Sequence, residues 1–252
     1  DVYKRQDQWK TGRHRTFAAL RLTDHETFGR RTTWNAEYAF ELNESWTLNA
    51  GLGHAFRAPD ATDRFGFGGN PDLDPELADE AQFGVRYAPG TGHSVNVEFY
   101  ANDIDDLIEF DLQTFTLQNI ARAEIRGAQF AYEFRGDHFV VHAEITKQSA
   151  EDGTTGERLL RRAEETASLS YTQDIGAHRL GLSLLASGDR EDFGGVRLDG
   201  YVLANLTAQF ALGDAWGIHA RIENLLDTKY QTAADYRMQE RSGFVELKFR
   251  WN

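Results

Sequence analysis

The sequence has no cysteine, one methionine and four prolines among its 252 residues. The lack of cysteine excludes disulfides, thiolate nucleophiles and zinc sites built on thiolates. No run of about 18 apolar residues occurs, so we expect no helix of this chain to cross a membrane. The first residue is Asp1 rather than a methionine, and the sequence is therefore interpreted as a fragment or a processed product.

Basic residues are also scarce, with 27 Lys and Arg against 40 Asp and Glu and a formal net charge of −13. Nucleic acid is not an expected partner, because the sequence shows no basic patch for phosphate contacts. No zinc-protease, nucleophile-elbow or phosphate-loop motif is present. The eight histidines are scattered, and the acidic stretch 103–111 lacks the glycine and spacing of a calcium loop. We expect no enzyme, no metal site and no resident cofactor.

Apolar and polar residues instead alternate over long stretches. Every second residue from Trp34 to Leu42 and from Val245 to Trp251 is apolar, and most of the intervening residues are polar. Alternation of this length indicates strands with two chemically different faces. About twelve strands are predicted, at 14–23, 32–42, 46–57, 78–88, 93–104, 122–135, 138–149, 163–173, 178–188, 198–211, 216–226 and 241–251. Residues 1–12 show no clear period and are left unassigned, so 13–252 is the region with a predicted fold.

The connections between these strands alternate between tight turns and long links. The long links are predicted at 24–31, 58–77, 105–121, 150–162, 189–197 and 227–240. Outer-membrane β-barrels have short turns at one end and long loops at the other, with aromatic residues near the strand ends. Lys and Arg fall on the polar face of the clearest strands, as a lipid-facing apolar side requires. The pattern favours an all-β, antiparallel transmembrane barrel over a soluble sandwich, which would alternate in a similar way.

Three stretches resemble the TonB-dependent receptor family of outer-membrane proteins. Residues 56–60 read FRAPD and are followed at 70–76 by NPDLDPE, which is similar to a specific signature of that family. Residues 222–230 (IENLLDTKY) resemble an element close to the family's C-terminus, and an aromatic strand then ends the chain. The resemblance implies about twelve C-terminal strands of a 22-stranded barrel, without the N-terminal plug.

The same resemblance implies a function. Such receptors lie in the outer membrane of Gram-negative-type bacteria, in contact with its lipid, and import a scarce ligand without catalysing a reaction. The implied partner is the inner-membrane TonB complex, which would contact the missing N-terminal region. Any calcium sites of the family would lie outside this stretch of sequence.

Within the family, the sequence is most similar to cobalamin receptors. Residues 103–111 (DIDDLIEFD) and 159–163 (LLRRA) resemble runs of those receptors, and the first arginine of LLRRA contacts the corrinoid there. The resemblance therefore makes Arg161 a candidate ligand residue. Phe193 takes the place of a ligand-contacting tyrosine, and it can stack on a macrocycle but has no hydroxyl. Phe65, Phe67 and Asn70, in the link 58–77, are further candidates.

Two alternatives remain open at this point. A receptor of the same family could take a ferric siderophore instead of cobalamin. The chain could also be a self-contained twelve-stranded outer-membrane barrel, such as a membrane-embedded hydrolase or an autotransporter translocator. A hydrolase would need Ser, His and acid groups converging at one strand end, and the sequence shows no such grouping.

Overall fold

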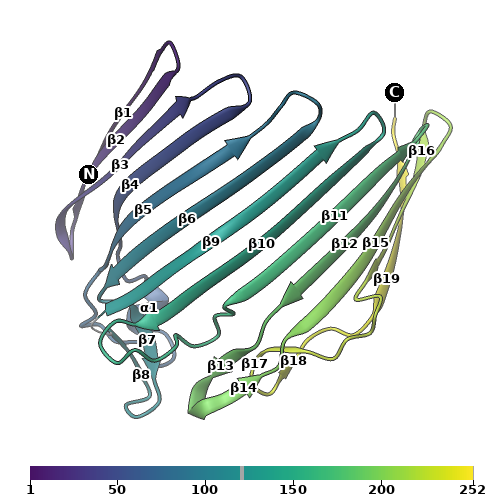
Figure 1. Cartoon of the computed structure of the whole chain (residues 1–252). Coiled ribbons are helices and arrows are strands. Elements are labelled where there is room, and N and C mark those ends of the chain that lie inside the picture. Colours follow the sequence, from purple (N-terminus) through teal and green to yellow (C-terminus); the bar gives the residue numbers. More distant parts are fainter. Residues whose placement is uncertain (120–121, 252) are drawn as a thin grey trace. The chain divides into compact units, whose positions relative to one another are not determined.

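The computed structural model of the chain describes residues 1–119 and 122–251, and antiparallel strands dominate it (Figure 1). Residues 120 and 121, at the end of the predicted link 105–121, and residue 252 lie outside the described residues. In the described part, helical structure is confined to α1 (Ala61–Phe65) and the 3-10 turn η1 (Phe193–Gly195). No helix in residues 1–119 and 122–251 is long and apolar enough to cross a membrane.

Among the described residues, thirteen long strands form one sheet whose hydrogen-bonded order follows the chain. They are β1 (Val2–Thr11), β2 (His14–His25), β3 (Gly29–Glu41), β4 (Trp46–Arg57), β5 (Glu76–Tyr87), β6 (His93–Asp105), β9 (Arg122–Arg135), β10 (Phe139–Asp152), β11 (Glu165–Ile175), β12 (His178–Ser187), β15 (Tyr201–Leu212), β16 (Trp216–Glu223) and β19 (Ser242–Phe249). Each of the twelve predicted strands overlaps one of these, which confirms the predicted fold class.

Short hairpins occupy three of the predicted long links. They pair β7 (Ile108–Asp111) with β8 (Thr116–Asn119), β13 (Arg190–Asp192) with β14 (Val196–Leu198), and β17 (Gln231–Ala233) with β18 (Tyr236–Arg237). Glycines with positive φ form several of the tight turns. Gly176 and Gly213 adopt φ of 59° and 71°, a left-handed conformation that glycine takes without the strain of a side chain.

The internal contacts divide the chain into two units. The first unit consists of Asp1–Tyr87, Val97–Ala128 and Gln148–Leu159, and the second of Ala88–Asn96, Gln129–Lys147 and Leu160–Asn252.

In the first unit, the strand register places the alternating apolar residues on one face. Trp34 of β3 lies opposite Leu20 of β2 and His54 of β4, and Ala36 lies opposite Leu52. Because residues directly opposite each other share a face, this side of the sheet is largely apolar. Trp34 and Leu52 are exposed, so no second layer formed by residues 1–119 and 122–251 covers this face.

Residues 1–12 were left unassigned from the sequence, and the structure shows that most of them form a strand. β1 pairs with β2 along its whole length. It accounts for the one strand by which the sheet of thirteen exceeds the twelve predicted strands. Its face opposite Leu20 carries Arg5 and Asp7 beside Trp9, and the two charges form an ion pair at 2.9 Å. The charges on this face break the alternation that identifies the other strands.

In the second unit, the last strand pair repeats the two-faced pattern. Trp216 lies opposite Phe249 and Ala220 opposite Val245, and Val245 is 79% exposed. On the other face, the Arg221 guanidinium lies 4.2 Å from the ring centroid of Phe244. A soluble sandwich would bury the apolar face against a second sheet, and the exposure contradicts that alternative.

Buried apolar residues gather at the long-link end of the first unit rather than along the strands. Leu107, Ala123, Ala150 and Leu159 form one cluster there, with Ile104 and Ile125 packed against it. This small core joins the end of β6, the start of β9 and the end of β10 to the long links beside them.

Candidate functional site

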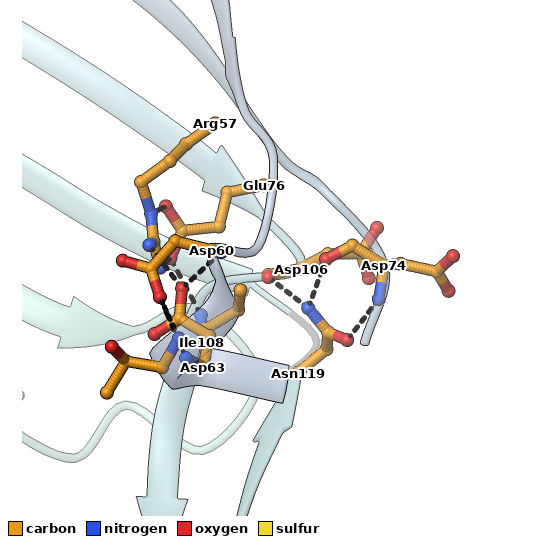
Figure 2. A network of polar contacts seen from close by, with 9 residues as sticks. Arg57, Asp60, Asp63, Asp74, Glu76, Asp106, Ile108 and Asn119 are labelled. Atoms are coloured by element: carbon orange, nitrogen blue, oxygen red, sulfur yellow. Dashed lines mark hydrogen bonds and ion pairs between the residues drawn. The ribbon is translucent and has the colours of Figure 1, made fainter. Parts of the chain in front are cut away.

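In the first unit, an arginine at the end of a strand holds the long link after β4. Arg57, the last residue of β4, binds Glu76 of β5 through Nε at 2.6 Å and Asp63 of α1 through Nη1 at 2.8 Å (Figure 2). We call these three residues the Arg57 network. It closes the link 58–75 by joining the helix inside it to the strands at both of its ends.

The short helix α1 is formed by a capping box. The Asp60 carboxylate accepts hydrogen bonds from the backbone nitrogens of Thr62 and Asp63, at 2.7 and 2.8 Å. In return, the Asp63 carboxylate accepts from the backbone nitrogen of Asp60 at 3.0 Å. This exchange satisfies backbone donors that otherwise lack partners at a helix start. The charged residues of FRAPD therefore build the link itself.

The β7–β8 hairpin contacts this link and the start of β5, through Asn119 and Glu76. Glu76 Oε1 accepts from the Ile108 nitrogen at 2.9 Å. Asn119 Nδ2 donates to the carbonyl oxygens of Asp74 and Asp106 at 3.0 and 2.6 Å, and its Oδ1 accepts from the Asp74 nitrogen at 2.9 Å (Figure 2). Burial, together with the nearby charges of Asp74 and Asp105, raises the pKa of the Asp106 carboxyl.

Of the three candidate ligand residues in this link, one builds the loop and two face outward. The Asn70 amide donates to the Leu117 carbonyl oxygen at 3.0 Å and accepts from the Asp72 nitrogen at 3.0 Å. Phe67 is 89% exposed, and Phe65 is also exposed, with the Arg64 guanidinium 5.0 Å from its ring centroid. Ligand contact by all three stays a prediction, with Phe65 and Phe67 the more accessible.

In the second unit, one buried carboxylate gathers three loop segments. The Asp192 side chain is 1% exposed and binds Arg161 Nε through Oδ1 at 2.7 Å. The same oxygen accepts from the Phe193 nitrogen at 2.8 Å, and Oδ2 accepts from the Ala234 nitrogen at 2.5 Å. We call these four residues the Asp192 cluster.

Within this cluster, the two candidate residues carried over from the resemblance lie together. The Arg161 guanidinium lies 5.0 Å from the centroid of the Phe193 ring. Arg161 adopts φ of 61°, and its backbone nitrogen donates to the Glu191 carbonyl oxygen at 2.7 Å. Burial raises the pKa of Asp192, but the hydrogen bonds from Arg161, Ala234 and Phe193 outweigh burial and hold it below its ordinary value.

The motif IENLLDTKY contributes a second buried polar residue in this unit. Asn224 accepts from the Thr228 nitrogen at 2.9 Å and donates to the carbonyl oxygens of Thr228 and Gln239 at 2.9 and 3.2 Å. Its backbone nitrogen donates to Asn205 Oδ1 at 2.9 Å. Asn224 therefore holds the link after β16 against β15, and this part of the motif has a structural role.

A cavity of about 420 Å³ lies between the β14–β15 junction and the last long link. Its lining combines basic, acidic and amide groups: Arg197, Leu198, Asp199, Gly200, Lys229, Tyr230, Gln231, Arg237, Met238 and Glu240. In the described residues, no group of three or more His, Cys, Asp or Glu side chains is arranged to hold a metal ion.

Sequence reasoning missed Asp192, Arg57 and Asn119. Arg57 carried a signal, because it belongs to the FRAPD stretch, but that stretch gave no contact partners. Asp192 stands in an acidic run beside Glu191, where a solvated side chain is the ordinary expectation. Its partner Ala234 is 42 positions away in the sequence.

A protein-family model and a curated protein both match most of this chain. The family model "TonB dependent receptor-like, beta-barrel" matches residues 6–225. The Vitamin B12 transporter BtuB of Vibrio vulnificus is 29% identical over 247 residues, which cover 93% of this chain and 40% of that protein. The chain thus spans about two fifths of this curated relative.

Two solved structures share the fold at low sequence identity. The ferric enterobactin receptor PfeA of Pseudomonas aeruginosa, in its G324V mutant form, gives a TM-score of 0.81 at 16% identity, covering 98% of this chain and 44% of that one. The siderophore receptor PirA of Acinetobacter baumannii gives 0.81 at 18% identity, covering 98% and 45%.

Proposed function

This chain belongs to the TonB-dependent receptor-like β-barrel family, and on that premise we propose that it is part of an outer-membrane receptor that binds cobalamin for import. The observation that carries the ligand assignment is the similarity to the Vitamin B12 transporter BtuB along 93% of the chain. The pairing of Arg161 with Phe193 supports it, because these are the two positions that the resemblance to cobalamin receptors implicates.

The two faces of the strands suit a barrel wall in a bilayer. Contact with hydrocarbon instead of water stabilises the exposed apolar face, which includes Trp34 and Val245. The other face carries charged residues such as Glu37 and Arg221, which suit a hydrated or plugged interior. We place the long links on the external side, where ligand arrives, because outer-membrane barrels have their long loops there.

The chain's chemical task in this proposal is recognition, without covalent catalysis or a resident cofactor. A planar guanidinium offers fixed hydrogen-bond donors, which suit amide and phosphate oxygens on a large ligand. An aromatic ring beside it offers a stacking surface for a flat macrocycle. Energy for release would come from the TonB complex acting on the complete receptor.

A ferric siderophore is the second candidate ligand. The solved structures of similar fold include a ferric enterobactin receptor and a siderophore receptor, each with a TM-score of 0.81. The cationic Arg161 would also attract an anionic iron chelate.

Growth rescue separates the two ligands. The complete gene is placed in one host that lacks its own cobalamin receptor and depends on external cobalamin, and in another that lacks its catecholate receptors under iron limitation. We expect growth on nanomolar cyanocobalamin and no rescue by a ferric catecholate. The reverse pattern would replace cobalamin by a siderophore, and rescue of neither host would refute both assignments. Equilibrium binding of cyanocobalamin to the purified receptor gives the matching affinity.

A further inference from the structure

We propose that Asp192 is a positioning residue for ligand binding, which fixes the Arg161 guanidinium and the Phe193 ring as one recognition surface without touching the ligand itself. The inference rests on the proposed function, because it takes Arg161 and Phe193 to be ligand contacts. It adds a residue to which neither the sequence motifs nor the comparisons assign a role.

The geometry of the carboxylate carries the inference. Asp192 is almost fully buried, so it is screened from a ligand. Both of its oxygens are engaged: Oδ1 by Arg161 Nε and the Phe193 nitrogen, and Oδ2 by the Ala234 nitrogen. One side chain therefore sets the position of the arginine, of the backbone that carries the aromatic ring, and of the link after β16.

Arg161 is held in a way that leaves it able to bind. Asp192 takes the Nε–H group, while the Arg161 side chain stays 46% exposed. The guanidinium lies over the Phe193 ring, which restricts its rotation further. A donor group held in its binding geometry before the ligand arrives loses less conformational freedom on binding, and this raises affinity.

The surrounding hairpin has supports that do not depend on the Asp192 carboxylate. The β13–β14 backbone pairs at Arg190 with Leu198 and at Glu191 with Arg197. Arg190 is itself buried, donates to Ser187 Oγ at 2.5 Å and lies 5.3 Å from the Tyr201 ring centroid. Loss of the Asp192 carboxylate should therefore misplace Arg161 and Phe193 while the hairpin stays paired.

The test compares Asp192→Asn with Glu191→Gln in the purified receptor encoded by the complete gene. Asparagine keeps the size of the side chain but presents an amide hydrogen donor to groups that are themselves donors. Glu191→Gln removes one negative charge from the neighbouring residue. We expect Asp192→Asn to weaken cyanocobalamin binding about tenfold or more, and Glu191→Gln to change it less than about twofold. Folded fraction is checked by circular dichroism and by heat-modifiable migration on gels.

A mutant cycle distinguishes positioning from general destabilisation. In a receptor that already carries Arg161→Ala and Phe193→Ala, Asp192→Asn should weaken binding less than about twofold, because the groups that it positions are gone. An equal loss in both backgrounds would assign Asp192 a structural role and overturn the inference. Unchanged binding by Asp192→Asn alone would also overturn it. A lack of cyanocobalamin binding by the unsubstituted receptor would refute the proposed function instead, so the two failures are distinguishable.

Discussion

In each unit, one charged side chain holds the long links in place, and the two side chains have opposite charges. In the first unit, the cation of Arg57 gathers two carboxylates, Glu76 and Asp63, and its side chain is 47% exposed. In the second unit, the buried anion of Asp192 gathers one guanidinium and two backbone nitrogens.

The difference shows how burial changes what a charged group does. Water competes for the half-exposed Arg57 guanidinium and weakens each of its contacts, so the link is held by several contacts together. The Asp192 carboxylate has almost no access to water and depends on its protein partners. The Arg57 network should therefore tolerate the loss of one member better than the Asp192 cluster does.

The largest expected difference between the two units is the effect of Asp192→Ala on local opening. The substitution leaves Arg161 and two backbone nitrogens without their acceptor, and we expect it to lower the local opening free energy of residues 189–197 and 231–237 by about 3 kcal/mol. Hydrogen exchange read by mass spectrometry on the receptor in detergent measures this quantity. Glu191→Ala is the matched control. Equal exchange in the two variants would contradict the interpretation that the buried Asp192 carboxylate holds these links.

The corresponding change in the first unit is Arg57→Gln. It removes the cation from Asp63 and Glu76, and we expect the opening free energy of residues 58–75 to fall by about 2 kcal/mol. Arg30→Gln removes an exposed arginine paired with Asp24 at 3.4 Å and should change exchange by less than about 1 kcal/mol. A larger effect for Arg57→Gln than for Asp192→Ala, on the same exchange scale, would reverse the comparison.

A smaller effect is expected at Gly68, a glycine where the link 58–75 contacts the β7–β8 hairpin. Gly68 has φ of 67°, and an added Cβ would lie 2.4 Å from Phe110 Cε2. We expect Gly68→Ala to loosen the contact between residues 58–75 and the β7–β8 hairpin by about 2 kcal/mol, from backbone strain and this clash. Gly156→Ala, at φ of 73° with open space around the new Cβ, should cost only about 1 kcal/mol. Equal proteolysis rates at the two sites would show that the clash is relieved without cost.

The smallest expected effect is that of pH on the second unit. The pKa of Asp192 is held below its ordinary value of 3.8, so the stability that its charge contributes is fully present above that value and is lost as pH falls through the folded-state pKa. We expect exchange at residues 189–197 to show no added opening from about pH 7.5 down to about pH 5, after correction for the intrinsic rate. Opening that begins near pH 6 would mean that Asp192 is not held as the structure has it.

The sequence predicted most strands because their two faces meet different surroundings. The run from Trp34 to Leu42 is readable for this reason, and β3 confirms it through residue 41. β1 was missed because the Arg5–Asp7 ion pair interrupts its apolar face. The three hairpins in the long links are too short to show a period, with strands of two to four residues.

The candidate site was predictable only in part. A motif pointed to Arg161, and its position beside Phe193 is a result of the structure. Asp192 could not be found, because its burial depends on a partner in a distant link. Motifs of this kind mark residues, whereas the contacts that set their geometry arise from tertiary packing.

The length of the strands has a mechanical consequence. A strand needs about 9–11 residues to cross the hydrocarbon of a membrane, whereas β9 and β10 have 14 residues each and β3 and β6 have 13. In the bilayer location that we propose, the surplus residues extend the hydrogen-bonded strands beyond the lipid. Arg57 ends β4 and Glu76 begins β5, and the two residues are paired, so the link 58–75 is anchored at both ends on hydrogen-bonded strands.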